Sequence, residues 1–221
     1  MEGPRTLRAV RSWQEAIPDR SGDEGVLEAM LLTVGAHGYE AASVQEVAQR
    51  SGISRDRFHR HFGSKDECFA QAYEEAAARL RDDVLEAGAR EPSWRLGFRA
   101  ALTELLRFVA EQPLLAKALL LEVRAARGRA WAAHQQAVER FVAAVDRARE
   151  DDEALPSASP TTAGFMVGAI EESLVLEIGA GRAGEVTRLL PDLCHLVVLN
   201  YFGEDEAWLE LRSEGSTAPA S

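Results

Sequence analysis

The segment of residues 43–65, SVQEVAQRSGISRDRFHRHFGSK, constrains the fold more than any other part of the sequence. Ser43 is suited to cap a helix, and Glu46 stands three residues later, where it closes a capping box. Gly52 follows at the point where a helix needs a residue that tolerates a positive φ, and Ser54 is suited to cap a second helix. The segment therefore predicts two short helices joined by a tight turn, which is a helix-turn-helix unit.

The second of these helices has one aromatic face and one basic face. Phe58 and Phe62 are four residues apart, so they share a face, and we assign both to the core. We also expect His61 to pack beside them. The remaining polar residues point elsewhere at about 100° per residue: Arg55, Asp56, His59 and Arg60. A helix with inward aromatics and an outward basic face suits the major groove of DNA.

Residues 23–69 resemble the N-terminal part of the TetR family of bacterial transcriptional repressors. The resemblance rests on Ser43 with Val47 and Ala48, the Gly52-Ile53-Ser54 turn, the Phe58 and Phe62 pair, and Ser64-Lys65. It implies a DNA-binding head, a connector helix that carries motion between head and body, and a helical body. It further implies a ligand-responsive repressor that acts as a homodimer on a palindromic operator and is controlled by a small-molecule effector.

The residues expected to contact DNA take different roles. An arginine guanidinium can bind guanine through two hydrogen bonds, which suits Arg55 and Arg60, and Gln45 can pair with adenine. Arg57 is expected on a phosphate or a base, and hydroxyl or amide contacts are expected where Ser43 and Ser54 begin helices. The resemblance assigns phosphate contacts to His59, which stands where the family commonly has Tyr, and to Lys65.

Asp56 departs from the family pattern, in which many relatives have a small residue, often Gly. A carboxylate near phosphates is repelled unless it accepts a hydrogen bond from a cytosine amino group or pairs with Arg60, four residues on. Asp56 therefore either sets a sequence preference or weakens DNA binding. The second possibility leaves open a TetR-like module that binds small molecules or proteins and has lost DNA binding.

The charge distribution is compatible with DNA as a partner. The chain has a net charge of -11, but residues 43–65 hold five basic and two acidic residues, so five minus two gives +3 there and -14 for the remainder. An acidic body with one basic face orients a protein on DNA. The two cysteines, Cys68 and Cys194, have no C-x-x-C spacing and predict no disulfide. Without a long apolar run or an apolar signal core, we expect a cytoplasmic protein.

The rest of the chain predicts an all-α fold. Apolar residues recur at helical spacing, and no segment alternates as a strand does, which gives about nine helices. The sequence DDEALPSAS at residues 151–159 predicts an exposed linker. The expected organisation is a flexible arm at 1–20, a helix-turn-helix domain at 21–66, a helical ligand-binding and dimerisation domain at 67–211, and a disordered tail at 212–221.

Two further sets of residues are candidates for binding in the body. Aromatic and flexible apolar side chains suggest a ligand pocket or a plain core: Trp94, Phe98, Trp131, Phe141 and Met166. Small and aliphatic residues on the last two strong helices suggest a four-helix dimer interface or an intramolecular core: Gly164, Val167, Gly168, Leu174, Leu193, Leu196 and Val197. Glu171 and Glu172 could face a cationic ligand or form a solvated or interface edge.

A glycine motif near the C-terminus offers a remote alternative. Gly179, Gly181 and Gly184 form G-x-G-x-x-G, the pattern of a loop that binds a nucleotide or S-adenosylmethionine. Such a loop needs a strand before it and a parallel sheet around it, neither of which this sequence predicts. A helix that ends in glycines fits better. Since no catalytic or metal-ligating constellation is present, we expect no enzyme activity, no metal and no cofactor.

Overall fold

The computed structural model describes residues 23–150, 159 and 161–212. Every regular element within these residues is a helix, which confirms the predicted all-α fold. No helix in this part of the chain is long and apolar enough to cross a membrane. The predicted arm at 1–20, most of the predicted linker at 151–159 and the tail beyond residue 212 lie outside the described residues.

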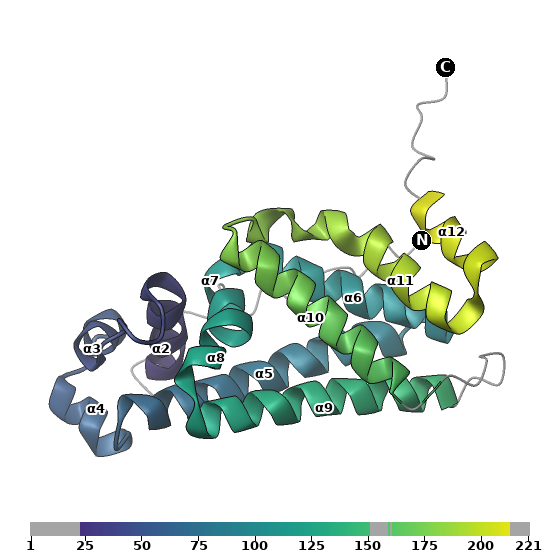
Figure 1. The fold of residues 1–221 in the computed structure, drawn as a ribbon. Coiled ribbons are helices and arrows are strands. Elements are labelled where there is room, and N and C mark those ends of the chain that lie inside the picture. The colour runs from purple at the N-terminus through teal and green to yellow at the C-terminus, as the bar shows by residue number, and fades with distance from the viewer. Residues whose placement is uncertain (1–22, 151–158, 160, 213–221) are drawn as a thin grey trace, which may run out of the picture.

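Three short helices form a head at one end of the molecule (Figure 1). They are α2 (Asp23–His37), α3 (Val44–Ser51) and α4 (Arg55–His61). One side chain or more from each helix is completely buried between them: Met30, Val34, Val47 and Phe58. This shared core holds α4 rigidly against α2 and α3, which leaves its other face to solvent.

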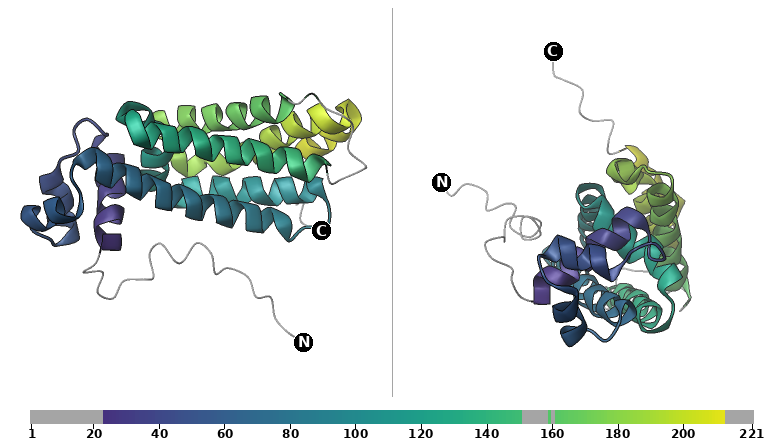
Figure 2. Two further views of the ribbon diagram at one scale, coloured as in Figure 1. Left: turned by 90° about the horizontal axis from the view of Figure 1, so that it is seen from below. Right: turned by 90° about the vertical axis from the view of Figure 1, so that its left-hand side faces the viewer.

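The long helix α5 (Lys65–Ala89) leaves the head and runs along the body (Figures 1 and 2). With 25 residues it is about 37 Å long at 1.5 Å per residue. It packs against α6 (Trp94–Glu111) and α9 (Gly128–Glu150). The body is completed by α10 (Thr162–Gly179), η2 (Ala183–Leu189), α11 (Leu190–Phe202) and α12 (Glu204–Arg212).

Residues 113–126 form one unbroken helical stretch whose central part is π-helical. α7 (Pro113–Ala116) passes into a π-helix, η1 (Lys117–Glu122), and then into α8 (Val123–Ala126). Apolar periodicity does not reveal the π-helical part, because a π-helix differs mainly in its backbone hydrogen bonds. The C-terminal segment forms a nine-residue helix, α12.

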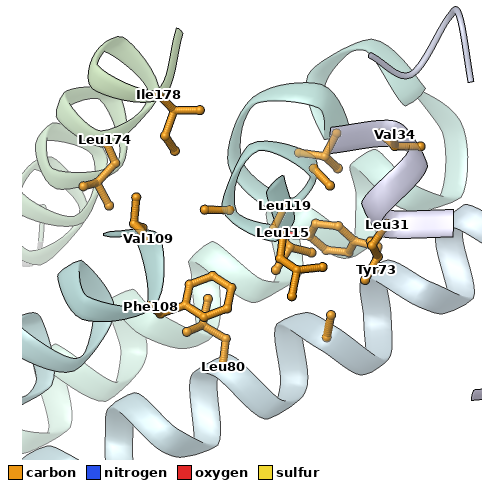
Figure 3. Close-up of a cluster of buried hydrophobic side chains, with 14 of the residues drawn as sticks. Leu31, Val34, Tyr73, Leu80, Phe108, Val109, Leu115, Leu119, Leu174 and Ile178 are labelled. Atoms are coloured by element: carbon orange, nitrogen blue, oxygen red, sulfur yellow. The ribbon is translucent and has the colours of Figure 1, made fainter. Parts of the chain in front are cut away.

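The head is joined to the body through these three pieces. Gly35 of α2 lies so close to α7 that a Cβ there would be 2.1 Å from the Leu114 carbonyl oxygen. The Glu122 carboxylate at the end of η1 accepts a hydrogen bond of 2.9 Å from the Tyr39 backbone N–H of the head. Figure 3 draws Leu31 of α2 in one buried cluster with Leu115 and with Tyr73 of α5. Head and body thus share a continuous packed junction.

The glycine motif closes a helix, as expected. α10 ends at Gly179, and Gly181 has a φ of +75°, the left-handed conformation that ends helices. Hydrogen bonds from Arg182 and Arg188 lower the pKa of Glu177 to about 2 across this turn. With no strand among the described residues, the sheet that a nucleotide-binding loop requires is missing from this part of the chain.

Candidate DNA interface and effector cavity

The local hydrogen bonds of the head confirm the predicted helix-turn-helix. Ser43 accepts from the Glu46 N–H at 3.3 Å, and the Glu46 carboxylate accepts from the Ser43 N–H at 3.0 Å, so the capping box is complete. Gly52 has a φ of +71°, and Ser54 accepts from the Arg57 N–H at 3.2 Å at the start of α4. These caps fix both ends of the turn.

Phe58 and Phe62 orient α4. Both are buried, and their ring centroids lie 5.3 Å apart. The opposite side is exposed to solvent and contains Arg55, Asp56, His59 and Arg60. His61, which we expected to pack beside the aromatics, is also exposed; α4 ends there, and the extended backbone at Phe62 turns that ring inward instead.

The other predicted DNA-contact residues surround this face. Gln45 and Ser54 are exposed, whereas Ser43, Arg57 and Lys65 are partly buried. The Lys65 ammonium donates to the Tyr39 carbonyl oxygen at 2.8 Å and lies 4.4 Å above the Tyr39 ring. This fixes its position, and an ammonium with three N–H donors can still donate to a phosphate.

Asp56 forms no ion pair with Arg60 among the described residues, although the four-residue spacing permits one. The carboxylate stands exposed on the same face as Arg55 and Arg60.

The body encloses a cavity of about 840 Å³ between α5, α6, α9 and α10. Its wall is mostly aliphatic and aromatic. Neither lysine nor arginine is among the described residues that line it; the ionisable ones are Tyr73, His134, Glu91 and Glu171. Small residues line the cavity on three helices: Ala77, Ala101, Ala137 and Ala144. Gly88 and Gly97, also in the lining, bring α5 and α6 into close contact, since a Cβ on Gly97 would lie 2.7 Å from the Gly88 carbonyl oxygen.

Three of the five pocket candidates line this cavity: Trp94, Phe98 and Phe141. The other two do not. Trp131 stacks on the His134 ring at 4.9 Å, and Met166 is buried elsewhere in the core. Of the polar cavity residues, the sequence suggested only Glu171 as a candidate to face a ligand; Tyr73, His134 and the small lining residues were missed, because they form no local motif.

A chain of hydrogen bonds occupies one end of the cavity. The Tyr73 hydroxyl lies 2.9 Å from His134 Nδ1, and His134 Nε2 lies 3.2 Å from Glu171 Oε1. Because the ionised carboxylate only accepts, Nε2 carries the proton, and in neutral His134 Tyr73 donates to Nδ1. Arg124 donates to Glu171 at 3.1 Å and to Glu172 at 3.0 Å.

This environment changes two pKa values. Burial, together with the nearby Glu171 charge, raises the pKa of Tyr73. Burial alone would also raise the pKa of Glu171, but the hydrogen bonds and charges of His134 and Arg124 outweigh it and lower that pKa. Glu171 is therefore ionised and Tyr73 neutral at neutral pH.

The outer faces of α10 and α11 carry large exposed apolar side chains. Phe165 is 74% exposed, Leu176 63% and Leu199 41%. Of the residues predicted for a dimer interface, Gly168 is exposed, and Gly164 and Leu196 are partly exposed. Val167 and Leu174 line the cavity instead, and Leu174, Leu193 and Val197 are buried within one protomer. Leu174, Leu193 and Val197 are therefore not available to a second copy, whereas Val167 is partly exposed.

Comparison with known proteins identifies the head. Residues 27–72 match the family model described as bacterial regulatory proteins, tetR family. The HTH-type transcriptional repressor AcnR of Corynebacterium efficiens is 36% identical over 66 residues, and AcnR of Corynebacterium glutamicum is 36% identical over 74 residues. The head therefore matches the TetR family, over residues 27–72. The AcnR matches span 30% and 34% of this chain but only 35% and 39% of the relatives, about a third of their length.

Solved structures show that the TetR-type fold extends over the body. The fatty acid degradation regulator FadR from Bacillus halodurans has a TM-score of 0.71 at 14% identity, covering 82% of this chain and 97% of that one. FadR from Bacillus subtilis, solved in complex with stearoyl-CoA, has a TM-score of 0.69 at 14% identity, with 81% and 98% covered. SmeT, the repressor of the Stenotrophomonas maltophilia multidrug efflux pump SmeDEF, has a TM-score of 0.67 at 17% identity, with 82% and 91% covered.

Proposed function

We propose that this protein is a transcriptional repressor that inserts α4 into the major groove of its operator. The observation that carries the proposal is the exposed face of Arg55, Asp56, His59 and Arg60 on a helix that buried phenylalanines and capped ends hold rigid. Side chains on such a helix reach base edges, and neighbouring groups at helix N-termini and on Lys65 bind phosphates. A chromosomal target means that the protein acts in the cytoplasm.

The proposed repressor is a homodimer on a palindromic operator. The apolar outer faces of α10 and α11, with Phe165, Leu176, Leu196 and Leu199, support pairing with a second copy as a four-helix interface. A twofold interface presents two copies of α4, which favours two half-sites spaced near whole helical turns. Gly164 and Gly168 stay in this proposed interface, since small residues allow close approach of helices.

The cavity supports control by a small apolar effector. Its volume of about 840 Å³ suits a small molecule. Two structural neighbours are FadR from Bacillus subtilis in complex with stearoyl-CoA and SmeT, the repressor of a multidrug efflux pump. We propose that effector binding changes the spacing of the two copies of α4. A coupling free energy of about 1–3 kcal/mol between the two sites is typical of such regulators.

Two elements are suited to carry this coupling. Tyr73 lines the cavity and lies on α5, the helix that continues into the head. Leu119 and Leu120 of η1 also line it, while Glu122 at the end of the same π-helix holds the Tyr39 backbone. A ligand that displaces either element therefore acts on the head directly.

A gel-shift experiment with DNA from upstream of its own gene, across a salt series, tests DNA binding. We expect a retained band whose affinity falls steeply with salt, because phosphate contacts release counterions. Arg55→Ala and Arg60→Ala should each weaken binding by about 1–3 kcal/mol. Arg90→Ala is the matched control, since it removes the same charge at the far end of α5, and it should leave affinity unchanged.

Absence of a band at every salt concentration would favour the alternative, a TetR-like module that binds small molecules or proteins without DNA. Equal effects of Arg60→Ala and Arg90→Ala would also contradict the proposal, because binding would then follow total charge and not the α4 face.

A further inference from the structure

The inner end of the cavity is negatively charged. Among the described residues around it, Glu171 and Glu172 carry two negative charges and Arg124 one positive charge, so these three side chains sum to -1. The lining itself contains the carboxylates Glu91 and Glu171 and no cationic side chain of the described residues. An anionic group would therefore be repelled there, and a cationic group attracted.

Glu171 has capacity for another hydrogen-bond donor. His134 and Arg124 both reach its Oε1, and Oε2 accepts no hydrogen bond from the described residues. Its side chain is 16% exposed, so a charge partner there would be screened less than one on the surface. A carboxylate with free lone pairs at the end of an apolar cavity is a site for an ammonium or another charged donor.

The cavity is also long. Along α5 its lining extends from Tyr73 to Ala89, which is about 24 Å at 1.5 Å per residue. This length suits an elongated molecule. The polar chain of Tyr73, His134 and Glu171 is at the inner end, and Glu91 and Ser93, both exposed, are at the outer end.

We propose that the effector is an elongated apolar molecule with a positively charged amine at one end, and that Glu171 is its counter-ion. The proposal rests on the effector cavity of the proposed function and specifies its ligand class. A free fatty acid or an acyl-CoA is disfavoured, since its anionic group would meet Glu171 inside or Glu91 at the mouth. This ligand class differs from that of the stearoyl-CoA complex among the TetR-fold neighbours.

The same geometry connects the amine to the head. An ammonium bound to Glu171 Oε2 shares the carboxylate with His134 and Arg124 on Oε1, and its positive charge weakens their attraction to it; His134 is also the hydrogen-bond partner of Tyr73. Tyr73 lies on α5 within the buried cluster that includes Leu31 of α2 (Figure 3). A ligand that weakens the His134–Glu171 hydrogen bond thus also affects the hydrogen bond between His134 and Tyr73, whose side chain packs beside the head.

Isothermal titration with three amphiphiles of equal chain length, dodecylammonium, dodecanol and dodecanoate, tests the ligand class at neutral pH and below their aggregation concentrations. We expect dodecylammonium to bind about tenfold more tightly than dodecanoate, with dodecanol between them. This comparison needs only the wild-type protein. Equal affinity for the three, or a preference for dodecanoate, overturns the proposal.

Two variants show which carboxylate causes the preference for dodecylammonium. Glu171→Gln should reduce the preference for dodecylammonium to about threefold or less, because the counter-ion is lost while the side-chain volume is kept. Glu91→Gln removes the same charge at the exposed outer end and should retain most of the preference, which controls for non-specific attraction to an acidic protein. If the Glu171→Gln variant unfolds at the same temperature as the wild type and still prefers dodecylammonium over dodecanoate, Glu171 is not the counter-ion.

A gel-shift with each amphiphile separates this proposal from the proposed function. Release of DNA by dodecylammonium supports both. Tight binding of dodecylammonium to a protein that never binds DNA supports the ligand class and contradicts the repressor. Release of DNA by dodecanoate, without binding of dodecylammonium, supports the repressor and overturns the ligand class.

Discussion

At position 56 the chain carries a carboxylate on the face that we propose meets DNA. Its neighbours Arg55 and Arg60 are exposed beside it, and no ion pair with Arg60 neutralises it among the described residues. A negative charge near phosphates lowers affinity for DNA in general, and a carboxylate that accepts from a cytosine amino group raises preference for one base. We therefore expect Asp56 to lower the overall affinity for DNA and to raise the preference for one base.

The variant Asp56→Asn tests both effects. Because the negative charge is lost, we expect affinity for DNA of unrelated sequence to rise about three- to tenfold. Discrimination at one cytosine position should fall by about 1–3 kcal/mol. Fluorescence anisotropy with the operator, a series of single-base variants and unrelated DNA measures both quantities. Unchanged discrimination at every position would show that Asp56 reads no base.

The thiols of the two cysteines should react slowly because both are buried. Burial raises the pKa of Cys68 to about 12 and that of Cys194 to about 11, above the ordinary thiol value near 9.0. Since the thiolate is the reactive form, both should resist iodoacetamide at pH 8 to 9 in the native protein and react once it is unfolded. Mass spectrometry before and after denaturation measures this. Rapid native labelling of either cysteine would contradict its packing.

Residue-level prediction succeeded where the signal is local. The caps at Ser43 and Ser54 and the inward Phe58 depend on neighbours three or four residues away, so the sequence alone reveals them. The bonds of Tyr73 to His134 and of His134 to Glu171 join residues 61 and 37 positions apart. No local pattern indicates such bonds, and for Glu171 the sequence suggested a ligand-facing role only as the alternative to a solvated or interface edge.

At the scale of elements, the junction between head and body was not predicted. Apolar spacing over about 114–127 predicts one helix, and residues 113–126 are helical throughout, but that spacing does not reveal that the central part, η1, is a π-helix or that it binds the head. The cavity escaped prediction for a similar reason. Small residues of α5, α6 and α9 line it, and whether they leave a space depends on how three helices are placed and not on any one of them.

Gly35→Ala tests the close packing of α2 on α7. A methyl group there would meet the backbone of Leu114, which has no side-chain freedom to move away, so we expect a loss of about 1–3 kcal/mol in the free energy of unfolding. Gly179→Ala is the control, because nothing lies within 4 Å of a Cβ at that position. Denaturant unfolding measures both. Equal stability of the two variants would contradict the packing described for the junction.

At the scale of the whole molecule, α4 of the head, the helices that line the cavity and the helices α10 and α11 belong to one helical framework (Figures 1 and 2). The framework and the head follow from the sequence and its resemblance to the TetR family. The interface does not, since small and aliphatic residues on α10 and α11 suit an internal core as well as a contact with a second copy. Burial divides them: Leu174, Leu193 and Val197 are internal, and Phe165, Leu176 and Leu199 are exposed.

Leu176→Glu tests the proposed dimer. A charge in the centre of an apolar interface lacks a partner, so we expect the variant to be monomeric at concentrations where the wild type is dimeric. Leu96→Glu is the matched control, as Leu96 is 46% exposed on α6, outside the proposed interface. Sedimentation velocity measures the state of each. A dimeric Leu176→Glu protein would place the interface elsewhere.

Selection from a random library of double-stranded DNA tests the central claim most directly. We predict enrichment of a palindromic site whose half-sites are spaced near whole helical turns, since each protomer of a dimer presents one α4. The double variant Arg55→Ala with Arg60→Ala, selected in parallel, should enrich no site. Failure of the wild-type protein to enrich any sequence, or enrichment of the same site by the double variant, would contradict reading of DNA by the exposed face of α4.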